Sequence, residues 1–183
     1  MRVLSVEGLP HPGKDAVLKY VSTGLRGTAP LVHHQCICDR YTSASYPVFL
    51  SALRNAQQLR RLASESQILL GRPFVDASHI PVISRLHSDV FVEMLRRNAV
   101  SIDEVRIVLL ECDPHDCFER LMTSPLSSMV ALDDVFESQV QIEEVIESLR
   151  ARVLRIPCPP FFDDDETAVL QIADKALHFL RGA

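Results

Sequence analysis

The sequence predicts an α/β fold, a three-layer sandwich in which helices cover both faces of a five-stranded parallel sheet. Short β-type runs alternate with amphipathic helical stretches along the chain, and this alternation is typical of parallel sheets. Residues 105–110 are almost entirely apolar, as expected of a strand that is buried on both faces. The 183 residues are 47% hydrophobic and 23% charged, so we expect a single globular domain over 1–183.

Each predicted element is a short run bounded by glycine, proline or polar residues. The strands are expected at residues 2–6, 31–38, 67–70, 105–110 and 152–156. Apolar residues at helical spacing predict helices up to about residue 25, from Pro47 onward, and over 80–97, 114–122, 133–150 and 165–180. Parallel sheets bind ligands beyond the carboxyl ends of their strands. We therefore expect the functional residues in the segments 7–15, 39–46, 71–78, 111–120 and 157–162.

Composition limits which partners the protein is expected to bind and where in the cell it is expected to be found. The net charge of −5 provides no basic surface for nucleic acid or a membrane, and no apolar run approaches the roughly 20 residues of a membrane helix. The chain has five cysteines, an odd number, and its first residues do not form a secretion signal. Reduced thiols and a cytoplasmic location are therefore expected.

The strongest motif is G-x-x-x-x-G-K at residues 8–14, between the first predicted strand and the first helix. In this context glycines let backbone N–H groups turn toward phosphates, and the lysine reaches the terminal phosphates. Serine or threonine normally follows the lysine, but this chain has Asp15. That carboxylate could bind Mg²⁺ or cap the helix. The predicted phosphate loop comprises Gly8, His11, Gly13, Lys14, Asp15 and Ala16.

The stretch 4–14 resembles the opening of thymidylate kinases and related deoxynucleoside kinases, whose first strand ends in I-E-G before the phosphate loop. Further segments are similar to the motifs that follow later strands of that family, at residues 38–41 (C-D-R-Y), 69–78 (L-L-G-R-P-F-V-D-A-S) and 109–120 (L-L-E-C-D-P-H-D-C-F-E-R). The resemblance implies a P-loop nucleotide kinase that uses ATP and Mg²⁺. Its implied acceptor is a small-molecule deoxypyrimidine nucleotide, most closely thymidine monophosphate.

The resemblance also implies roles for single residues. Lys14 would hold the donor phosphates, Arg40 would grip the acceptor monophosphate, and Arg72 would lie beside the transferred phosphoryl group. Arg120 matches the first arginine of the family's lid, here a segment near 121–132. Guanidinium groups suit this chemistry because phosphoryl transfer depends on positioning and on neutralising spread negative charge.

Three further implications stay open at this stage. Asp39 is the candidate general base if the acceptor is a sugar hydroxyl, although the alignment that gives it this role is shifted by one residue from the alignment that places Arg40. Tyr41 and Phe74 match positions that stack the acceptor base, and core packing explains them almost as well. The family also implies a homodimer through the two long amphipathic helices, whose apolar faces the core needs equally.

The chain departs from the family at three places. Asp15 replaces the loop hydroxyl, Gly71 replaces the acidic partner of Arg72, and residues 121–132 contain no arginine. These changes remove charges that stabilise the transition state. Two alternatives to a thymidylate-kinase-like enzyme therefore stand: a catalytically inactive homologue that acts as a nucleotide-binding or protein-interaction module, and a deoxynucleoside (thymidine) kinase.

Several other groups have a functional and a structural interpretation. His34, Cys36 and Cys38 would share one strand face, but they lack the paired spacing of zinc ligands, so packing is favoured. Cys112 and Cys117 are either a redox pair or packing residues. The acidic run 163–166 is interpreted as favourable charge at the start of the last helix.

Overall fold

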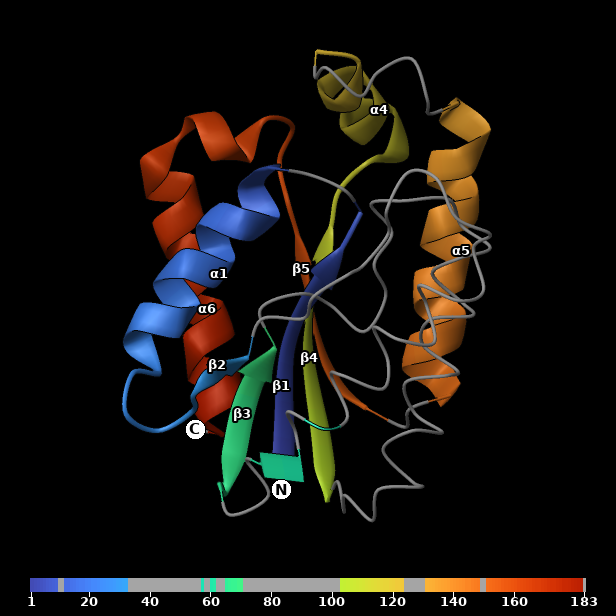
Figure 1. Cartoon of the computed structure of the whole chain (residues 1–183). Helices are drawn as coiled ribbons and strands as arrows, with labels where there is room; N and C mark the ends of the chain where they lie inside the picture. The colour runs from blue at the N-terminus through green and yellow to red at the C-terminus, as the bar shows by residue number, and fades with distance from the viewer. Residues whose placement is uncertain are drawn as a thin grey trace.

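The chain forms a parallel sheet with the strand order β2-β3-β1-β4-β5 (Figure 1). The computed structural model describes residues 1–9, 12–32, 57, 60–61, 65–70, 103–123, 131–148 and 151–182. The strands are β1 (Arg2–Gly8), β2 (Leu31–Val32), β3 (Gln67–Leu70), β4 (Glu104–Glu111) and β5 (Arg152–Pro157). All paired neighbours are parallel.

The prediction of a parallel α/β sheet is confirmed, but the count of five full strands holds only in part. Four strands have four or more residues, whereas β2 has two. The rest of the predicted strand 31–38 lies outside the described residues. β1 runs two residues beyond its predicted end at residue 6, because Glu7 and Gly8 continue the ladder against Leu109 and Leu110 of β4.

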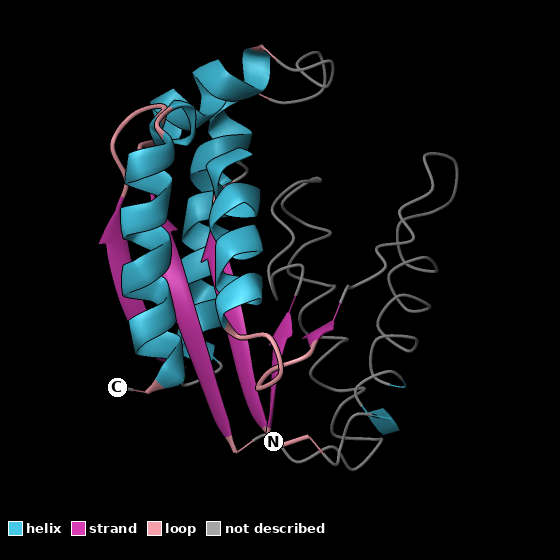
Figure 2. Cartoon of the chain, turned by 90° about the vertical axis from the view of Figure 1, so that its left-hand side faces the viewer, coloured by secondary structure: helices cyan, strands magenta, loops and turns pink. Residues whose placement is uncertain are grey.

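Helices lie on both sides of this sheet (Figures 1 and 2). The elements are α1 (Pro12–Gly24), α4 (Pro114–Met122), α5 (Leu132–Ser148), the 3₁₀ turn η2 (Phe162–Asp164) and α6 (Glu166–Arg181). α1 and α6 contact each other on one face, α5 lies on the other, and α4 follows the carboxyl end of β4. Their bounds agree with the predicted helices to within two residues. The predicted helices from Pro47 and over 80–97 lie outside the described residues, apart from positions 57, 60 and 61.

The core explains why these segments form strands and helices. Leu4 and Val6 of β1 pack with Val17 and Val21 of α1 and with apolar residues of α6. Each fully buried aliphatic side chain contributes about 1.5–3 kcal/mol relative to exposure. The alternate residues of β1 face the other side and are buried too, as expected of a sheet covered on both faces.

Side chains fix the starts of two helices. Asp113 accepts a hydrogen bond from the backbone N–H of His115 at the start of α4, where Pro114 occupies the first helical position. Asp165 accepts one from Thr167 at the start of α6. Such caps stabilise a helix by about 1 kcal/mol. Among the described helices none is long and apolar enough to cross a membrane.

Candidate functional site

The candidate site lies at the carboxyl end of β1, where the chain turns into α1. Gly8 ends the strand with a φ of 148°, and a Cβ placed there would lie 2.8 Å from the carbonyl oxygen of Leu110. Only glycine therefore allows β1 to approach β4 so closely at this point. α1 begins at Pro12, so the positive end of its dipole is directed at the loop.

Lys14 lies over the end of the strand. Its half-buried side chain donates a long hydrogen bond of 3.4 Å from Nζ to the Gly8 carbonyl oxygen. Within the described ranges no carboxylate lies at ion-pair distance from this ammonium group. A weakly held ammonium beside a helix N-terminus is suited to bind an anion.

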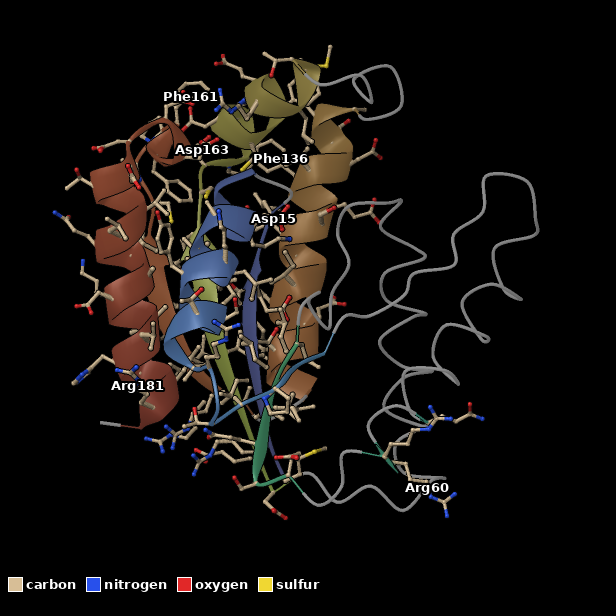
Figure 3. All side chains as sticks on the ribbon, turned by 60° about the vertical axis from the view of Figure 1, so that its left-hand side comes forward. Asp15, Arg60, Phe136, Phe161, Asp163 and Arg181 are labelled. Carbon is tan, nitrogen blue, oxygen red and sulfur yellow. The ribbon has the colours of Figure 1, made fainter. Side chains whose placement is uncertain are left out.

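Asp15 and Ala16 follow on the first turns of α1. Asp15 is exposed and lies in the first turn rather than at the N-cap (Figure 3). The alternative in which it caps the helix is therefore wrong, although its charge still interacts favourably with the helix dipole. Ala16 is half-buried and packs against the core, and its role in binding stays a prediction.

The loop after β5 packs against the phosphate loop. Phe162 is 2% exposed, and a Cβ placed at Gly13 would lie 2.2 Å from Cζ of its ring. Gly13 is thus required by a close contact as well as by the motif. This contact joins η2 to the first turn of α1, and the sequence offered no pattern that predicted it.

Arg120, the predicted lid arginine, points from the end of α4 toward the same loop. It donates hydrogen bonds to Asp163 at 2.7 Å and to Asp164 at 2.6 Å, and its guanidinium carbon lies 5.5 Å from the centre of the Phe161 ring. The two carboxylates raise the pKa of Arg120. Its charge is therefore engaged within the protein in this structure.

This arrangement corrects one interpretation of the sequence. The acidic run 163–166 was expected to favour the start of the last helix, and only Asp165 and Glu166 do so, as cap and first-turn residue of α6. Asp163 and Asp164 instead neutralise Arg120. Figure 3 shows Phe161, Asp163 and Asp15 toward one end of the molecule.

A buried carboxylate lies at the end of β1, one residue before the phosphate loop. Glu7 precedes Gly8 and is fully buried, and the hydroxyl of Ser5, also fully buried, donates a hydrogen bond to Glu7 Oε1. A buried acid must be hydrogen-bonded because an unpaired charge in the interior is costly. The sequence drew attention to Glu7 only through its place directly before the glycine motif, and it did not predict that the side chain is buried.

The other predicted site residues lie outside the described part of the chain. These are His11, Asp39, Arg40, Tyr41, Arg72 and Phe74. Gly71 and the group His34, Cys36 and Cys38 lie outside it as well. The described residues bring together Gly8, Gly13, Lys14 and Asp15 directly, and they connect Arg120 to this group through the loop after β5.

The residues present fit ATP and magnesium. Lys14 and the N-terminus of α1 suit phosphate oxygens, and Asp15 offers one exposed carboxylate. Mg²⁺ is commonly held by one or two carboxylates together with the phosphates of a substrate. The described residues contain no cluster of three side chains that would hold a metal without such a substrate.

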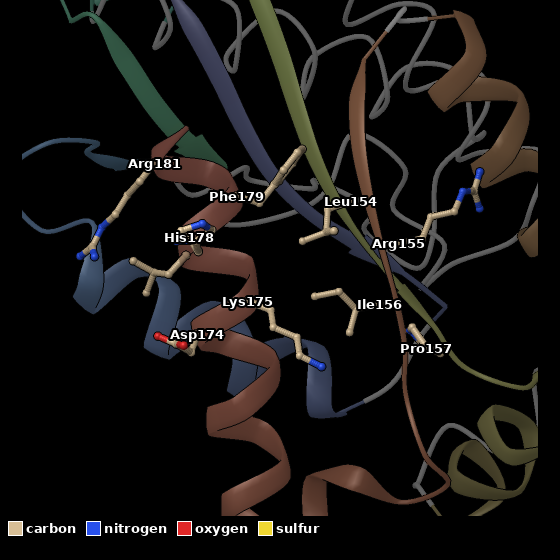
Figure 4. A pocket seen from close by; sticks show the side chains of 10 residues that line it. Leu154, Arg155, Ile156, Pro157, Asp174, Lys175, His178, Phe179 and Arg181 are labelled. Atoms are coloured by element: carbon tan, nitrogen blue, oxygen red, sulfur yellow. The ribbon is translucent and has the colours of Figure 1, made fainter. Parts of the chain in front are cut away.

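A separate groove lies between β5 and α6 (Figure 4). It has a volume of about 620 Å³, and Leu154, Ile156, Lys175 and His178 are among its lining residues. None of the described residues of the phosphate loop lines it. The groove is therefore distinct from the candidate site.

Comparison with known proteins identifies the fold. No protein-family model and no curated protein matches the chain. Solved structures do match. The YorR protein of Bacillus subtilis, crystallised in complex with phosphorylated GDP, is 12% identical with a TM-score of 0.59, over 98% of this chain and 95% of that chain. The deoxyadenosine kinase of M. mycoides, with its products dCMP and dCDP bound, is 10% identical with a TM-score of 0.56, over the whole of both chains.

The chain shares its fold with these two structures, one of which is a deoxyadenosine kinase. In this fold, the glycine motif follows the carboxyl end of β1, and Arg120 lies on α4, which follows the carboxyl end of the neighbouring strand β4. Identities this low show the fold alone, and the activity is a separate question.

Proposed function

We propose that the chain binds ATP on its phosphate loop and is a nucleotide kinase-like protein that transfers a phosphoryl group to a deoxypyrimidine nucleotide. The observation that carries the proposal is the position of Lys14, whose ammonium group lies 3.4 Å from the Gly8 carbonyl oxygen beside the N-terminus of α1. The kinase fold and the nucleotides bound to both solved structures support it.

In this proposal each described residue has a defined task. Lys14 and the backbone at the start of α1 would hold the β- and γ-phosphates, and Asp15 would hold Mg²⁺. Bound there, ATP would supply the phosphoryl group and the metal would neutralise the charge that develops on it. Arg120 adds a guanidinium group when the phosphates compete with Asp163 and Asp164 for it. Arg40 and Arg72 are assigned to the acceptor and to the transferred group from the family resemblance.

A catalytically inactive homologue is the second candidate, and it would act as a nucleotide-binding or protein-interaction module. It is favoured by Arg120, whose side chain two carboxylates engage, and by Asp15 in place of a hydroxyl residue. Lost arginine contacts in such sites reduce rates by about 10³–10⁵-fold. The deoxynucleoside kinase alternative depends on Asp39, which lies outside the described residues.

Product formation separates these candidates. The chain is incubated with ATP and Mg²⁺ and with thymidine monophosphate, deoxycytidine monophosphate or thymidine in turn, and ADP and the phosphorylated acceptor are measured. A deoxypyrimidine diphosphate product supports the proposal, and a product from thymidine alone selects the nucleoside kinase. ATP binding without any phosphorylated product selects the inactive homologue.

The role of Asp15 is tested by Asp15→Asn. Asp174→Asn, at an exposed position of α6, is a control with the same change of charge. Loss of a carboxylate ligand to Mg²⁺ should weaken ATP binding about 10-fold in the presence of magnesium. Binding in the presence of EDTA should not weaken. Calorimetric titration measures both. Tighter binding of ATP with magnesium would show that the carboxylate repels the phosphates instead.

A further inference from the structure

Three cysteines come together at the carboxyl ends of β4 and β5. Cys112 directly follows β4, and Cys158 directly follows β5. The last paired positions of these strands are Glu111 and Pro157, and the backbone N–H of Cys158 continues the ladder with a 2.9 Å hydrogen bond to the Glu111 carbonyl oxygen. Cys112 and Cys158 are therefore opposite each other at the next register position.

The sulfur atoms of the cluster interact. The thiol of Cys158 donates a 3.4 Å hydrogen bond to the Ile156 carbonyl oxygen, and the side chain of Cys112 lies beside those of both Cys117 and Cys158. This contact, together with burial, raises the pKa of the Cys117 and Cys158 thiols. Cys112 is the side chain next to both of the others, and it follows β4 just before the N-terminus of α4, where the helix dipole favours a negative charge.

Geometry and exposure distinguish the two neighbours of Cys112. Paired strands lie about 4.8 Å apart, and disulfides span Cα separations of about 4.4–6.8 Å, so the register position suits a bond to Cys158. Cys112 and Cys158 are partly exposed, whereas Cys117 is fully buried in α4. An oxidant from solvent reaches the first two thiols more readily than the third.

We propose that Cys112 and Cys158 are a modification site, an oxidisable thiol pair that forms a reversible disulfide between the ends of β4 and β5. The oxidant is a peroxide. The Cys112 thiolate attacks one peroxide oxygen, the O–O bond breaks, and the departing hydroxide takes a proton to become water. The sulfur of Cys158 then attacks the resulting sulfenic acid, and the S–O bond breaks with release of a second water. Two thiols lose two electrons, and the peroxide gains them.

The bond would act on the loop after β5. That loop begins at Cys158 and carries Phe162, which packs on Gly13, and Asp163, which holds Arg120. A disulfide would fix the base of the loop to the end of β4. The proposal concerns the thiols themselves and does not depend on the proposed function.

The test uses the full chain with Cys36→Ser and Cys38→Ser, which leaves the three cysteines of the cluster. The folded protein is treated with hydrogen peroxide, remaining thiols are blocked with N-ethylmaleimide, and peptides are mapped without reduction. We expect the peptides that contain Cys112 and Cys158 to be joined, with one thiol left to react with the maleimide. Treatment with dithiothreitol should restore all three.

Matched variants in the same background assign the bond. Adding Cys117→Ser should leave the crosslink unchanged, and adding either Cys112→Ser or Cys158→Ser should abolish it, with thermal unfolding used to confirm that each variant is folded. Three results would each overturn the proposal. The first is that all three thiols of the folded chain stay unreacted under conditions that oxidise the chain unfolded in guanidinium. The second is a crosslink between Cys112 and Cys117. The third is oxidation to sulfinic acid without any crosslink.

Discussion

The two ends of the sheet use charge in opposite ways. At the amino ends of the strands, Glu104 accepts hydrogen bonds from Arg2, Arg106 and Arg152, and Arg106 also bonds the Phe179 carbonyl oxygen of α6. At the carboxyl ends, Lys14 has a 3.4 Å bond to a carbonyl oxygen and no carboxylate among the described residues at ion-pair distance. The amino end uses its charges to hold the fold. At the carboxyl end Arg155 is likewise paired with Glu111 and Glu143, but Lys14 stays available.

Arg120 is intermediate between these two cases. It lies at the carboxyl end of the sheet, yet Asp163 and Asp164 contact it at 2.7 and 2.6 Å, distances similar to the 2.7 and 2.9 Å from Arg2 and Arg106 to Glu104. A ligand with phosphate groups must displace those carboxylates before it gains the guanidinium group. Lys14 is therefore ready to bind an anion, whereas Arg120 must first be released from its carboxylates.

The largest expected effect comes from removing the available cation. Lys14→Ala should weaken ATP binding about 10- to 100-fold, because a hydrogen bond to a charged group contributes about 1.5–3 kcal/mol. Lys19→Ala, on the exposed side of α1, is the matched control and should bind as the wild type does. Calorimetric titration measures both affinities. Equal affinity for the two variants would mean that Lys14 does not hold phosphate.

The contact between Gly13 and the Phe162 ring should contribute to the stability of the fold. Gly13→Ala places a methyl group in the space of the Phe162 ring and should destabilise the fold by about 1–3 kcal/mol, as overpacking does. Denaturant unfolding measures the loss. In a chain that carries Phe162→Leu, Gly13→Ala should cost less stability than it does in the unmodified chain. An equal cost in the two backgrounds would show that the ring is not the cause.

At the opposite end, Glu104→Gln should lower the free energy of unfolding by about 1 kcal/mol near neutral pH, a modest value because the ion pairs are partly exposed. Glu119→Gln, at an exposed position of α4, is the control. ATP binding should not change in either variant. A loss of ATP affinity with Glu104→Gln would contradict the division of roles between the two ends.

The ion pairs of Glu104 also predict that the free energy of unfolding depends on pH. Arg106, Arg2 and Arg152 lower the pKa of Glu104 from 4.5 to about 2. Because the folded value lies below the unfolded one, the stability that this carboxylate contributes is complete above about pH 4.5 and is lost as the pH falls toward 2. Unfolding curves across that interval should converge for the wild type and Glu104→Gln. Curves that stay equally far apart would exclude the ion pairs as the cause.

The smallest expected effect concerns Arg120. Asp164→Asn removes one of its two carboxylate partners and should tighten ATP binding about 2- to 5-fold, as expected when a partly exposed ion pair of up to about 1 kcal/mol no longer competes. Asp174→Asn changes the same charge away from the loop and should have no effect. An affinity for ATP that is unchanged or weaker in Asp164→Asn would mean that Arg120 takes no part in binding.

Local patterns predicted most of the described fold. The strand at 67–70 and the helix at 114–122 have the predicted bounds, because apolar runs, Pro114 and the cap at Asp113 are signals within a few residues of the element. The extension of β1 to Gly8 was missed, since Glu7 is polar and its burial depends on pairing with a distant strand.

The site shows the same limit of sequence information. Glycine spacing predicted the loop and Lys14, but the contact of Phe162 with Gly13 joins residues 149 positions apart, and the partners of Arg120 lie 43 and 44 positions away. Such contacts follow from the packing of the loop after β5 on α1 and α4. The only local signal was an acidic run, which is equally typical of a helix start.

Thermal unfolding of the unmodified chain in the presence of ATP and Mg²⁺ tests most directly whether the loop binds a nucleoside triphosphate. At 100 times its dissociation constant a ligand stabilises the native state by about 2.7 kcal/mol, which corresponds to a rise of about 5–10 °C in Tm for a chain of this size. We expect that rise with ATP and, at the same ATP concentration, a rise of about half that size or less in Lys14→Ala. An unchanged Tm of the unmodified chain with millimolar ATP, ADP and thymidine phosphates would contradict the account.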